Sequence, residues 1–380
     1  MKILLLLSAF VLSYAETFDT FLTHVVDKNP YLNASALMID NARLEGKKLS
    51  RYDNPTIEME ASNFQTSYGY RMAFNQPVRV WGVGDDKEKI ARSLSANAKA
   101  SVTMVRSSFI KELSLLYTDF AQNQKLAELA NEELQIAQSI KEVSKQRYAN
   151  GSLSKALMLQ SSVVYADAQA NVMEYEKEKV KSYNALREYA GVTEEVIIES
   201  DSIFTRISQV NQSPNLVLLE SQNDLKLAQT KLETRTIESI GVFGEYEKEP
   251  GQNIYRAGIS IPIPMFNTKQ EEKSIQELQL RQNTLLLKAQ KNRIQARENL
   301  LLNEIDSLEH VLQKRQENLK NALELFKMYR DAYAIANVNL MEFYEIKNRR
   351  IATQKEMISV QSQINRSTIE YNYLQGAYNE

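Results

Sequence analysis

The chain has 380 residues, with 46 lysines and arginines against 48 aspartates and glutamates, which gives a formal net charge of −2. This balance excludes the broad basic field that nucleic-acid binding needs, so we expect no nucleic-acid partner. The sequence contains no cysteine, which excludes disulfides, thiolate metal sites and cysteine nucleophiles. The two histidines, His24 and His310, are too few for a histidine-rich metal centre.

Sequence motifs of catalysis are also missing. The phosphate-binding pattern GxxxxGK[ST] and the hydrolase pattern GxSxG do not occur. His310 lies beside Leu308, Val311 and Leu312 in a long helical stretch, where packing or solvation explains it better than catalysis. We therefore predict that the protein is not an enzyme, has no catalytic residues, and holds no cofactor and no metal.

The N-terminal residues have the pattern of a targeting signal. Lys2 supplies a positive charge, residues 3–12 form an apolar stretch, and Ser13-Tyr14-Ala15 fits a cleavage site with small residues. This pattern predicts a secretory signal peptide over residues 1–15 and a mature chain that begins at Glu16. The apolar stretch is too short for a transmembrane helix, and no other run approaches the ~18 residues of one. We expect an exported protein.

The prolines divide the chain into helical and extended tracts. No proline lies between residues 78 and 213 or after residue 264, and proline interrupts helix interiors. Asparagine and glycine favour helix ends, so Asn150-Gly151 and the stretch 337–339 are expected to interrupt the two tracts. The pattern predicts helices over about 84–149, 153–190, 268–333 and 338–375, with shorter helices over 30–52 and 214–237.

Four segments around the remaining prolines alternate apolar and polar residues with period two, which is typical of strands with one apolar face. They cover about 57–62, 70–75, 240–247 and 255–263. We expect two hairpins, over about 55–81 and 239–266, with turns at Ser67-Tyr68-Gly69 and at 250–253. Trp81 and several tyrosines lie near the strand ends, where aromatic residues of a membrane interface occur.

Landmarks recur along the chain at a constant distance. Pro262 follows Pro77 by 185 positions, and Tyr333 follows Tyr148 by 185 positions. This recurrence indicates a duplicated unit of short helix, hairpin, long helix, turn and medium helix. The first repeat covers 16–195 with a tip turn at about 148–153, a linker covers 196–212, and the second repeat covers 213–380 with a tip turn at about 334–340.

The expected helix lengths match within each repeat. A helix over 84–149 is about 99 Å long at 1.5 Å per residue, and the two shorter helices placed end to end have nearly the same length. We expect the shorter helices to run antiparallel beside the long one. Apolar residues recur every 3.5 residues from Ile305 to Tyr333 and every 3.75 residues from Ile90 to Phe120. Unless this spacing is fortuitous, it predicts a left-handed coiled coil toward the tips and a straighter layer toward the strands.

The expected strands have the length of outer-membrane crossings, which need ~9–11 residues. Four strands do not close a barrel, and lipid does not tolerate an open sheet edge. Three copies of the chain would supply 12 strands, enough for a barrel with an interior pore. The alternative is a soluble sheet whose edges are covered by helices.

The order of these elements carries a family resemblance. The segments that carry it are Arg147-Tyr148-Ala149-Asn150-Gly151 at the first tip, the stretch 184–191 (NALREYAG) at the end of the first repeat, and 257–264 (AGISIPIP) in the last strand. Together with the signal peptide and the duplication, they resemble the TolC-like outer-membrane efflux factors over essentially the whole mature chain.

The resemblance implies a mainly helical protein with a small β part. It would be a homotrimer with a 12-strand β-barrel in the outer membrane of a Gram-negative bacterium, continued by a periplasmic α-helical coiled-coil barrel. Its implied function is the passive exit duct of a tripartite efflux pump. The partners would be an inner-membrane efflux transporter, a periplasmic adaptor (membrane fusion) protein and outer-membrane lipid. A secreted coiled-coil structural or adhesion protein is the alternative function, and the sequence does not identify a substrate.

The resemblance also implies sites at the two tips. The family's tip motif is Tyr-x-x-Gly, and the residues implied in adaptor docking are Tyr148, Gly151, Ser152, Leu153, Tyr333, Ala336, Asn337 and Val338. Ala336 replaces the glycine of the motif in the second tip. Glu342 and Glu345, nine and twelve residues after Tyr333, are implied in a periplasmic gate that selects cations. The alternative is an ordinary helix start, where carboxylates favour the positive end of the helix dipole.

Overall fold

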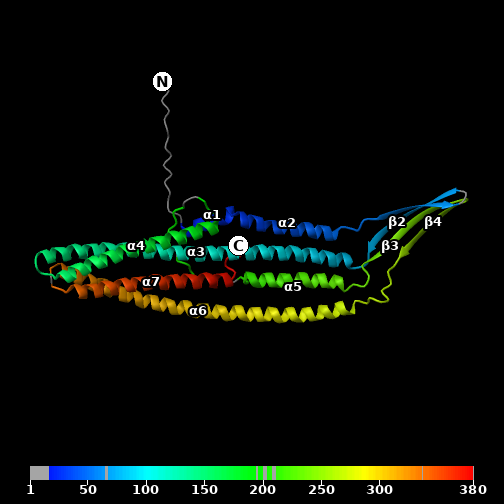
Figure 1. Ribbon diagram of the computed structural model, residues 1–380. Coiled ribbons are helices and arrows are strands. Elements are labelled where there is room, and N and C mark those ends of the chain that lie inside the picture. Colours follow the sequence, from blue (N-terminus) through cyan, green and yellow to red (C-terminus); the bar gives the residue numbers. More distant parts are fainter. Residues whose placement is uncertain are drawn as a thin grey trace, which may run out of the picture. The chain divides into compact units, whose positions relative to one another are not determined.

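The computed structural model describes residues 17–64, 67–193, 196–199, 203–207, 211–335 and 337–379, so the predicted signal peptide lies outside the described residues. The chain is mainly helical with one small antiparallel sheet (Figure 1). The helices are α1 Phe18–Lys28, α2 Pro30–Ser50, α3 Val83–Ala149, α4 Lys155–Ala190, α5 Pro214–Glu233, α6 Gln270–Ala334 and α7 Leu340–Leu374. The strands are β1 Thr56–Phe64, β2 Ser67–Arg79, β3 Ser239–Glu249 and β4 Gln252–Ser260.

The long helices confirm the prediction from the proline-free tracts. Helix α3 has 67 residues and α6 has 65, so each is about 100 Å long at 1.5 Å per residue. Within the described helices, none is both long enough and apolar enough to cross a membrane.

Helix α1 was not predicted. Its N-cap Thr17 accepts a hydrogen bond from the backbone N–H of Thr20 at 3.4 Å, and Phe18, Phe21 and Val25 form its buried face. These three residues are spaced by three and four positions, which is typical of an amphipathic helix. The sequence pattern was therefore sufficient to predict α1.

The predicted breaks at the two tips are confirmed. Gly151 has φ +73°, a left-handed conformation that suits glycine, and the N–H of Ser152 closes the end of α3 on the carbonyl of Arg147 at 2.8 Å. Ser154 then caps α4 by accepting from the N–H of Leu157 at 3.3 Å. In the second tip Asn339 caps α7 by accepting from the N–H of Met341 at 3.2 Å.

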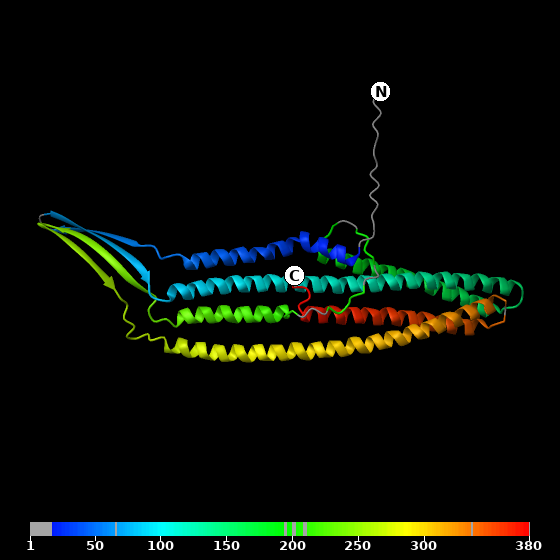
Figure 2. The same cartoon turned by 180° about the vertical axis from the view of Figure 1, so that it is seen from behind.

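The four strands form one antiparallel sheet in the order β1-β2-β3-β4, and Figure 2 shows them side by side from behind. The first predicted turn was wrong, because 67–69 belong to β2 and Phe64 pairs with Ser67, which leaves residues 65–66 outside the described part. In the second hairpin Glu249 pairs with Gln252, so the turn is only Pro250-Gly251. Strand β4 stops at Ser260, before two prolines that lack the N–H a ladder requires.

The chain divides into two compact units, and each contains parts of both repeats. The first, here called the helical unit, consists of Met1–Asn33, Arg106–Gln212 and Ile294–Glu380. The second, here called the sheet unit, consists of Ala34–Val105 and Ser213–Arg293, and it contains all four strands.

Shorter helices pack on longer ones within each unit, as the matched lengths predict. In the helical unit α4 lies on α3, where the rings of Phe109 and Tyr189 stack with centroids 5.0 Å apart. In the sheet unit α2 approaches the start of α3 so closely that a Cβ added at Gly46 would lie 3.0 Å from the Cβ of Ala91. Helix α5 ends at Glu233 instead of 237, and Arg235 just beyond it bonds Asp86 of α3 at 2.5 Å.

The described part of the predicted linker 196–212 is tied into the helical unit. The ring of Phe204 packs edge-on against Phe18 with centroids 5.5 Å apart, and its N–H donates to the Asn365 side chain at 3.4 Å. The N–H of Ile207 donates to the Asn372 side chain at 3.1 Å. Two asparagines of α7 thus satisfy backbone groups of residues 203–207, which form no helix or strand.

Asn29 connects three elements of the helical unit, and its replacement by alanine should destabilise the protein. Its buried carboxamide accepts from the N–H groups of Tyr31 and Leu32 at the start of α2 and donates to the carbonyl of Ala190 at the end of α4 at 3.0 Å. We expect Asn29→Ala to lower the free energy of unfolding by about 1–3 kcal/mol, since it removes a helix cap and leaves a buried carbonyl unpaired. Thermal unfolding followed by circular dichroism measures the change.

The matched control is Asn33→Ala at an exposed position of α2. This control should change stability by less than about 0.5 kcal/mol, as is usual for surface sites. Equal melting temperatures for the two variants would contradict the assigned role of Asn29.

Candidate functional site

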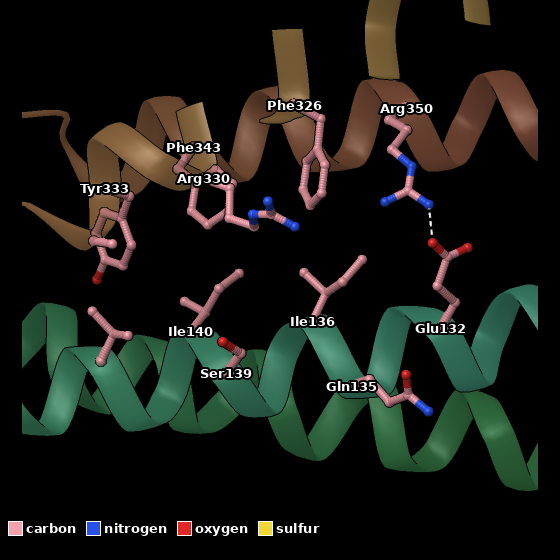
Figure 3. A pocket seen from close by; sticks show the side chains of 12 residues that line it. Glu132, Gln135, Ile136, Ser139, Ile140, Phe326, Arg330, Tyr333, Phe343 and Arg350 are labelled. Carbon is pink, nitrogen blue, oxygen red and sulfur yellow. Dashed lines mark hydrogen bonds and ion pairs between the residues drawn. The ribbon is translucent and has the colours of Figure 1, made fainter. Parts of the chain in front are cut away.

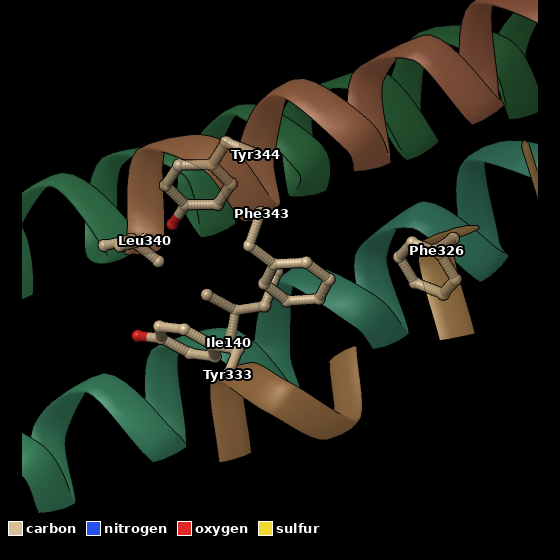
Figure 4. Packing of buried hydrophobic residues seen from close by; sticks show 6 residues of the cluster. All are labelled: Ile140, Phe326, Tyr333, Leu340, Phe343 and Tyr344. Atoms are coloured by element: carbon tan, nitrogen blue, oxygen red, sulfur yellow. The ribbon is translucent and has the colours of Figure 1, made fainter. Parts of the chain in front are cut away.

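The tip of the second repeat is built on a hydrophobic cluster of three helices (Figure 4). This tip cluster consists of Ile140 from α3, Phe326 and Tyr333 from α6, and Leu340, Phe343 and Tyr344 from α7. The ring of Phe343 stacks between Tyr333 and Phe326, with centroids 5.3 Å and 5.7 Å apart. The turn between α6 and α7 is therefore anchored to α3 by aromatic packing.

The two tip tyrosines, which correspond in the repeats, have different environments. Tyr333 is only 2% exposed, its hydroxyl hydrogen-bonds the Ser144 hydroxyl at 2.8 Å, and the Arg147 guanidinium lies 4.9 Å from its ring centre. Tyr148 is 41% exposed. Within the chain, Tyr333 thus holds α6 to α3, whereas Tyr148 is open to solvent.

The other predicted docking residues lie mostly on the surface. Gly151 and Ser152 are exposed and Leu153 is half-buried in the first tip. In the second tip Asn337 is exposed and Val338 is half-buried, while Ala336 lies outside the described residues. More of the predicted docking residues are therefore accessible in the first tip than in the second.

The two predicted gate carboxylates lie at the start of α7 and are exposed. Glu342 is in the first turn, three residues after the cap Asn339, and Glu345 forms an ion pair with Arg349 at 3.4 Å. The carboxylates are three residues apart and share one side of the helix. A helix start with a favourable dipole accounts for them in one chain, and their role in a gate stays a prediction.

Two buried cations on α7 were not identified from the sequence. Lys347 and Arg350 are only 2% and 4% exposed. The Lys347 ammonium binds Glu133 of α3 at 3.0 Å, and Arg350 binds the neighbouring Glu132. Their spacing of four and seven residues after the buried Phe343 was the available signal. Both partners of the Lys347 pair are largely buried, so removing Glu133 would cost about 3–5 kcal/mol, whereas Glu132 is half exposed and screened by solvent.

A groove of about 360 Å³ runs beside the tip cluster (Figure 3). Ile136 and Ile140 of α3 face Phe326 of α6 across the groove, and Glu132 and Arg330 add charged groups to its lining. An apolar side chain flanked by polar groups would suit such a groove. Among the described residues, no group of three or more histidines and carboxylates is arranged to hold a metal ion.

The sheet is the second candidate site, because its two faces differ in polarity. The strand register places the apolar side chains together on one face, where they are 42–76% exposed. They include Ile57, Met59, Tyr70, Met72, Phe74, Val242, Tyr255 and Ile259. An exposed apolar face of this extent indicates a surface that another molecule or lipid covers.

The opposite face carries a chain of ion pairs that crosses all four strands. This charge ladder consists of Glu60, Arg71, Glu245, Glu247 and Arg256. Arg71 binds Glu60 at 3.4 Å and Glu245 at 2.8 Å, and Arg256 binds Glu245 and, at 2.6 Å, Glu247. The alternating signs hold the four strands in register on the polar face.

The described sheet has two open edges. Strand β1 pairs only with β2, and β4 pairs only with β3. Each outer strand therefore presents N–H and C=O groups without a partner strand in the described chain.

Comparisons with known proteins bear on the fold. No family model matches the chain, and no curated protein matches it in sequence. Among solved structures, it is similar to CusC, whose structures concern transmembrane channel formation, with TM-score 0.76 and 14% identity over 94% of this chain and 91% of that one.

Two further structures give the same picture. The outer membrane protein VceC of Vibrio cholerae has TM-score 0.76 and 13% identity, over 94% of this chain and 95% of that one. The open state of the MtrE outer membrane channel of Neisseria gonorrhoeae has TM-score 0.73 and 10% identity, over 94% and 88%. The chain thus has the fold of outer-membrane channels, which confirms the predicted resemblance at the level of the fold.

The hydroxyl of Tyr344 generates a prediction about pH. Burial raises the pKa of Tyr344 well above its usual range, and the hydroxyl has no hydrogen-bond partner in the described part of the chain. The neutral phenol thus contributes stability fully below the ordinary tyrosine pKa of about 10 and loses it as the pH rises further.

Tyr344→Phe should therefore keep or raise the melting temperature at pH 7 and reduce its decline between pH 9 and 11. Calorimetric scans across this pH range measure both effects, with Tyr148→Phe at the exposed tip as the control. A melting temperature several degrees lower for Tyr344→Phe at neutral pH would show that the hydroxyl is needed.

Proposed function

We propose that this protein is the outer-membrane exit duct of a tripartite efflux pump. Three copies would form a 12-strand β-barrel in the outer membrane of a Gram-negative bacterium, continued by a periplasmic α-helical coiled-coil barrel. The observation that carries the proposal is a sheet with an exposed apolar face, a charged opposite face and two open edges, in a chain with the fold of outer-membrane channels.

The physical argument starts from the sheet. Its strands have 9 to 13 residues, near the ~9–11 that cross the apolar layer at a tilt. The apolar face suits lipid, and the charge ladder suits a water-filled interior. The open edges exclude a single four-stranded sheet from the bilayer, because lipid offers them no hydrogen bonds. Closure of the barrel by two further copies would give each open edge a partner strand and leave the apolar face in contact with lipid.

The helices supply the rest of the proposed duct. Two helices of about 100 Å per chain have the length to line a tunnel across much of a periplasm. The 3.5-residue spacing near the second tip favours a coiled coil among them. Transport through such a tunnel is passive and requires no catalysis, so the energy would come from an inner-membrane transporter.

The tips are the proposed contact with a periplasmic adaptor protein. Tyr148, Gly151 and Ser152 are exposed, and the groove lined by Ile136 and Phe326 would receive apolar side chains of a partner helix. Tyr333 supports this surface from inside through the tip cluster. The runner-up function, a secreted coiled-coil structural or adhesion protein, would leave the apolar face of the sheet without a lipid partner.

Membrane extraction and conductance test the proposal directly. We expect the full chain, expressed with its N-terminal segment, to leave the outer-membrane fraction only with detergent and to migrate as a trimer that heat dissociates. The detergent-purified trimer should form discrete conductance steps in planar bilayers. Recovery of the protein in the medium without detergent would favour the secreted alternative and contradict the duct.

The carboxylates at the start of α7 generate a prediction about selectivity. Threefold symmetry would bring three copies each of Glu342 and Glu345 around one axis, where like charges favour cations. Replacing both by glutamine should weaken cation selectivity and the block of the channel by multivalent cations, as measured by reversal potentials in planar bilayers.

The matched control is the double glutamine variant of Glu271 and Glu277, exposed carboxylates near the start of α6. This control should conduct like the unmodified protein. Unchanged selectivity in the Glu342 and Glu345 variant would mean that these carboxylates cap α7 and do not line a constriction.

A further inference from the structure

The charge ladder obeys the same repeat distance as the rest of the chain. Arg256 follows Arg71 by 185 positions, and Glu245 follows Glu60 by 185 positions. This is the distance that separates Pro77 from Pro262. Each hairpin therefore contributes one acid and one arginine to the ladder, and the second hairpin adds Glu247, whose counterpart in the first is Ser62.

The two hairpins are also equivalent in register at this acid–arginine pair. Glu60 lies opposite Arg71 in the first hairpin, and Glu245 lies opposite Arg256 in the second. In each case the arginine forms an ion pair with the opposite carboxylate. The same offset of 185 thus maps the whole first hairpin onto the second.

One contact of the ladder joins the two hairpins. Arg71 on β2 reaches across to Glu245 on β3 at 2.8 Å. Within one chain this contact has no repeat-related counterpart, because that counterpart would join Arg256 on β4 to Glu60 on β1. These two strands are the opposite, open edges of the sheet.

We propose that the missing contact forms between copies of the chain, so that Arg256 of one copy pairs with Glu60 of the next. This inference rests on the proposed trimeric barrel. It specifies the seam, by which we mean the junction between β4 of one copy and β1 of the next. The β4–β1 seam would repeat the register of β2 and β3, in which Tyr70 lies opposite Lys248. It follows that Tyr255 lies opposite Asn63 of the next copy, and Ser260 opposite Glu58.

Charge complementarity favours this partner. The polar face of the β1 edge presents two carboxylates, Glu58 and Glu60, whereas that of the β4 edge presents the guanidinium of Arg256, whose side chain is 47% exposed. Across the sheet the ladder reads acid, base, acid, base from β1 to β4. A second copy beginning again with an acid continues the alternation without placing like charges opposite each other.

The backbone of the two edges also matches. In the second hairpin Glu249 and Gln252 flank a two-residue turn, and residues that flank such a turn form a hydrogen-bonded pair, with every second pair along the ladder likewise bonded. The first hairpin has the same register at an offset of 185 and so the same alternation. Glu245 and Arg256 therefore exchange backbone hydrogen bonds. The backbone N–H and C=O groups of the residues on either side of Arg256 then point to the open edge. The same count on β1 directs those of Met59 and Ala61 outward.

When the β4 edge of one copy pairs with the β1 edge of the next, the residues of the apolar face form the backbone hydrogen-bonded pairs. The charged residues then occupy the non-hydrogen-bonded positions, where side chains lie closer together. The junction of β2 and β3 has the same arrangement, and there Arg71 and Glu245 form their ion pair.

Cysteine cross-linking tests the register, because the chain has no cysteine of its own. The variant with Ser260→Cys and Glu58→Cys places both thiols at a predicted non-hydrogen-bonded pair, within the reach of a disulfide. Mild oxidation of the detergent-purified trimer should convert it to a covalent trimer on a non-reducing denaturing gel. The control with Ser260→Cys and Thr56→Cys, two residues out of register, should cross-link at least about tenfold less.

A second measurement reports the ion pair itself. In Arg256→Lys, a zero-length carbodiimide should join the new amine to Glu60 of the neighbouring copy, which mass spectrometry of the linked peptides identifies. Adding Glu60→Gln should remove this linkage, whereas adding Glu245→Gln should leave it. Because positions 60 and 256 lie on opposite edges of one chain's sheet, this linkage reports a contact between copies.

The outcomes separate this inference from the proposed function. A trimer that conducts but cross-links no better in the predicted register than in the control, or lacks the linkage between positions 256 and 60, would overturn the seam and leave the duct intact. A chain that forms no trimer at all would overturn both.

Discussion

Backbone hydrogen bonding at the two ends of a four-stranded sheet is the constraint on which the rest of this structure depends. Strands β1 and β4 each have one open edge, and the face that carries Ile57 and Met59 is apolar and exposed. Water satisfies the edges and makes the apolar face unfavourable, whereas lipid suits the face and leaves the edges unsatisfied. Neither solvent suits the isolated sheet, which is why the proposed assembly follows from the strands before the helices are considered.

The duplication has given the two hairpins the same role and the two tips different ones. The hairpins share register and charge, because each contributes to one continuous sheet. At the tips, Tyr333 packs inside a cluster of three helices while Tyr148 stays in solvent. The second tip is therefore fixed to α3 by packing, whereas the tyrosine of the first tip is accessible to solvent.

Ion pairs specify alignment within both the helical unit and the sheet unit. Lys347 and Arg350 bind adjacent carboxylates of α3, so a shift of α7 by one turn would leave buried charges unpaired. The charge ladder does the same for the strands through Arg71 and Arg256. Leaving the buried Lys347 without its carboxylate is costly, whereas each partly exposed pair of the charge ladder contributes little by itself. They therefore favour one register over its neighbours.

The sequence by itself determined the elements that depend on local periodicity: the long helices, the four strands and the two tip breaks. Period 3.6, period two and the positions of proline and glycine act within a few residues, so no knowledge of distant partners was needed. The amphipathic spacing of α1 was also local and was overlooked. Only the tertiary structure decided which of two equivalent tyrosines is buried, that Lys347 lies inside, and that β2 pairs with β3. Each of these depends on residues more than a hundred positions away, and a side chain's burial is set by the partner that covers it.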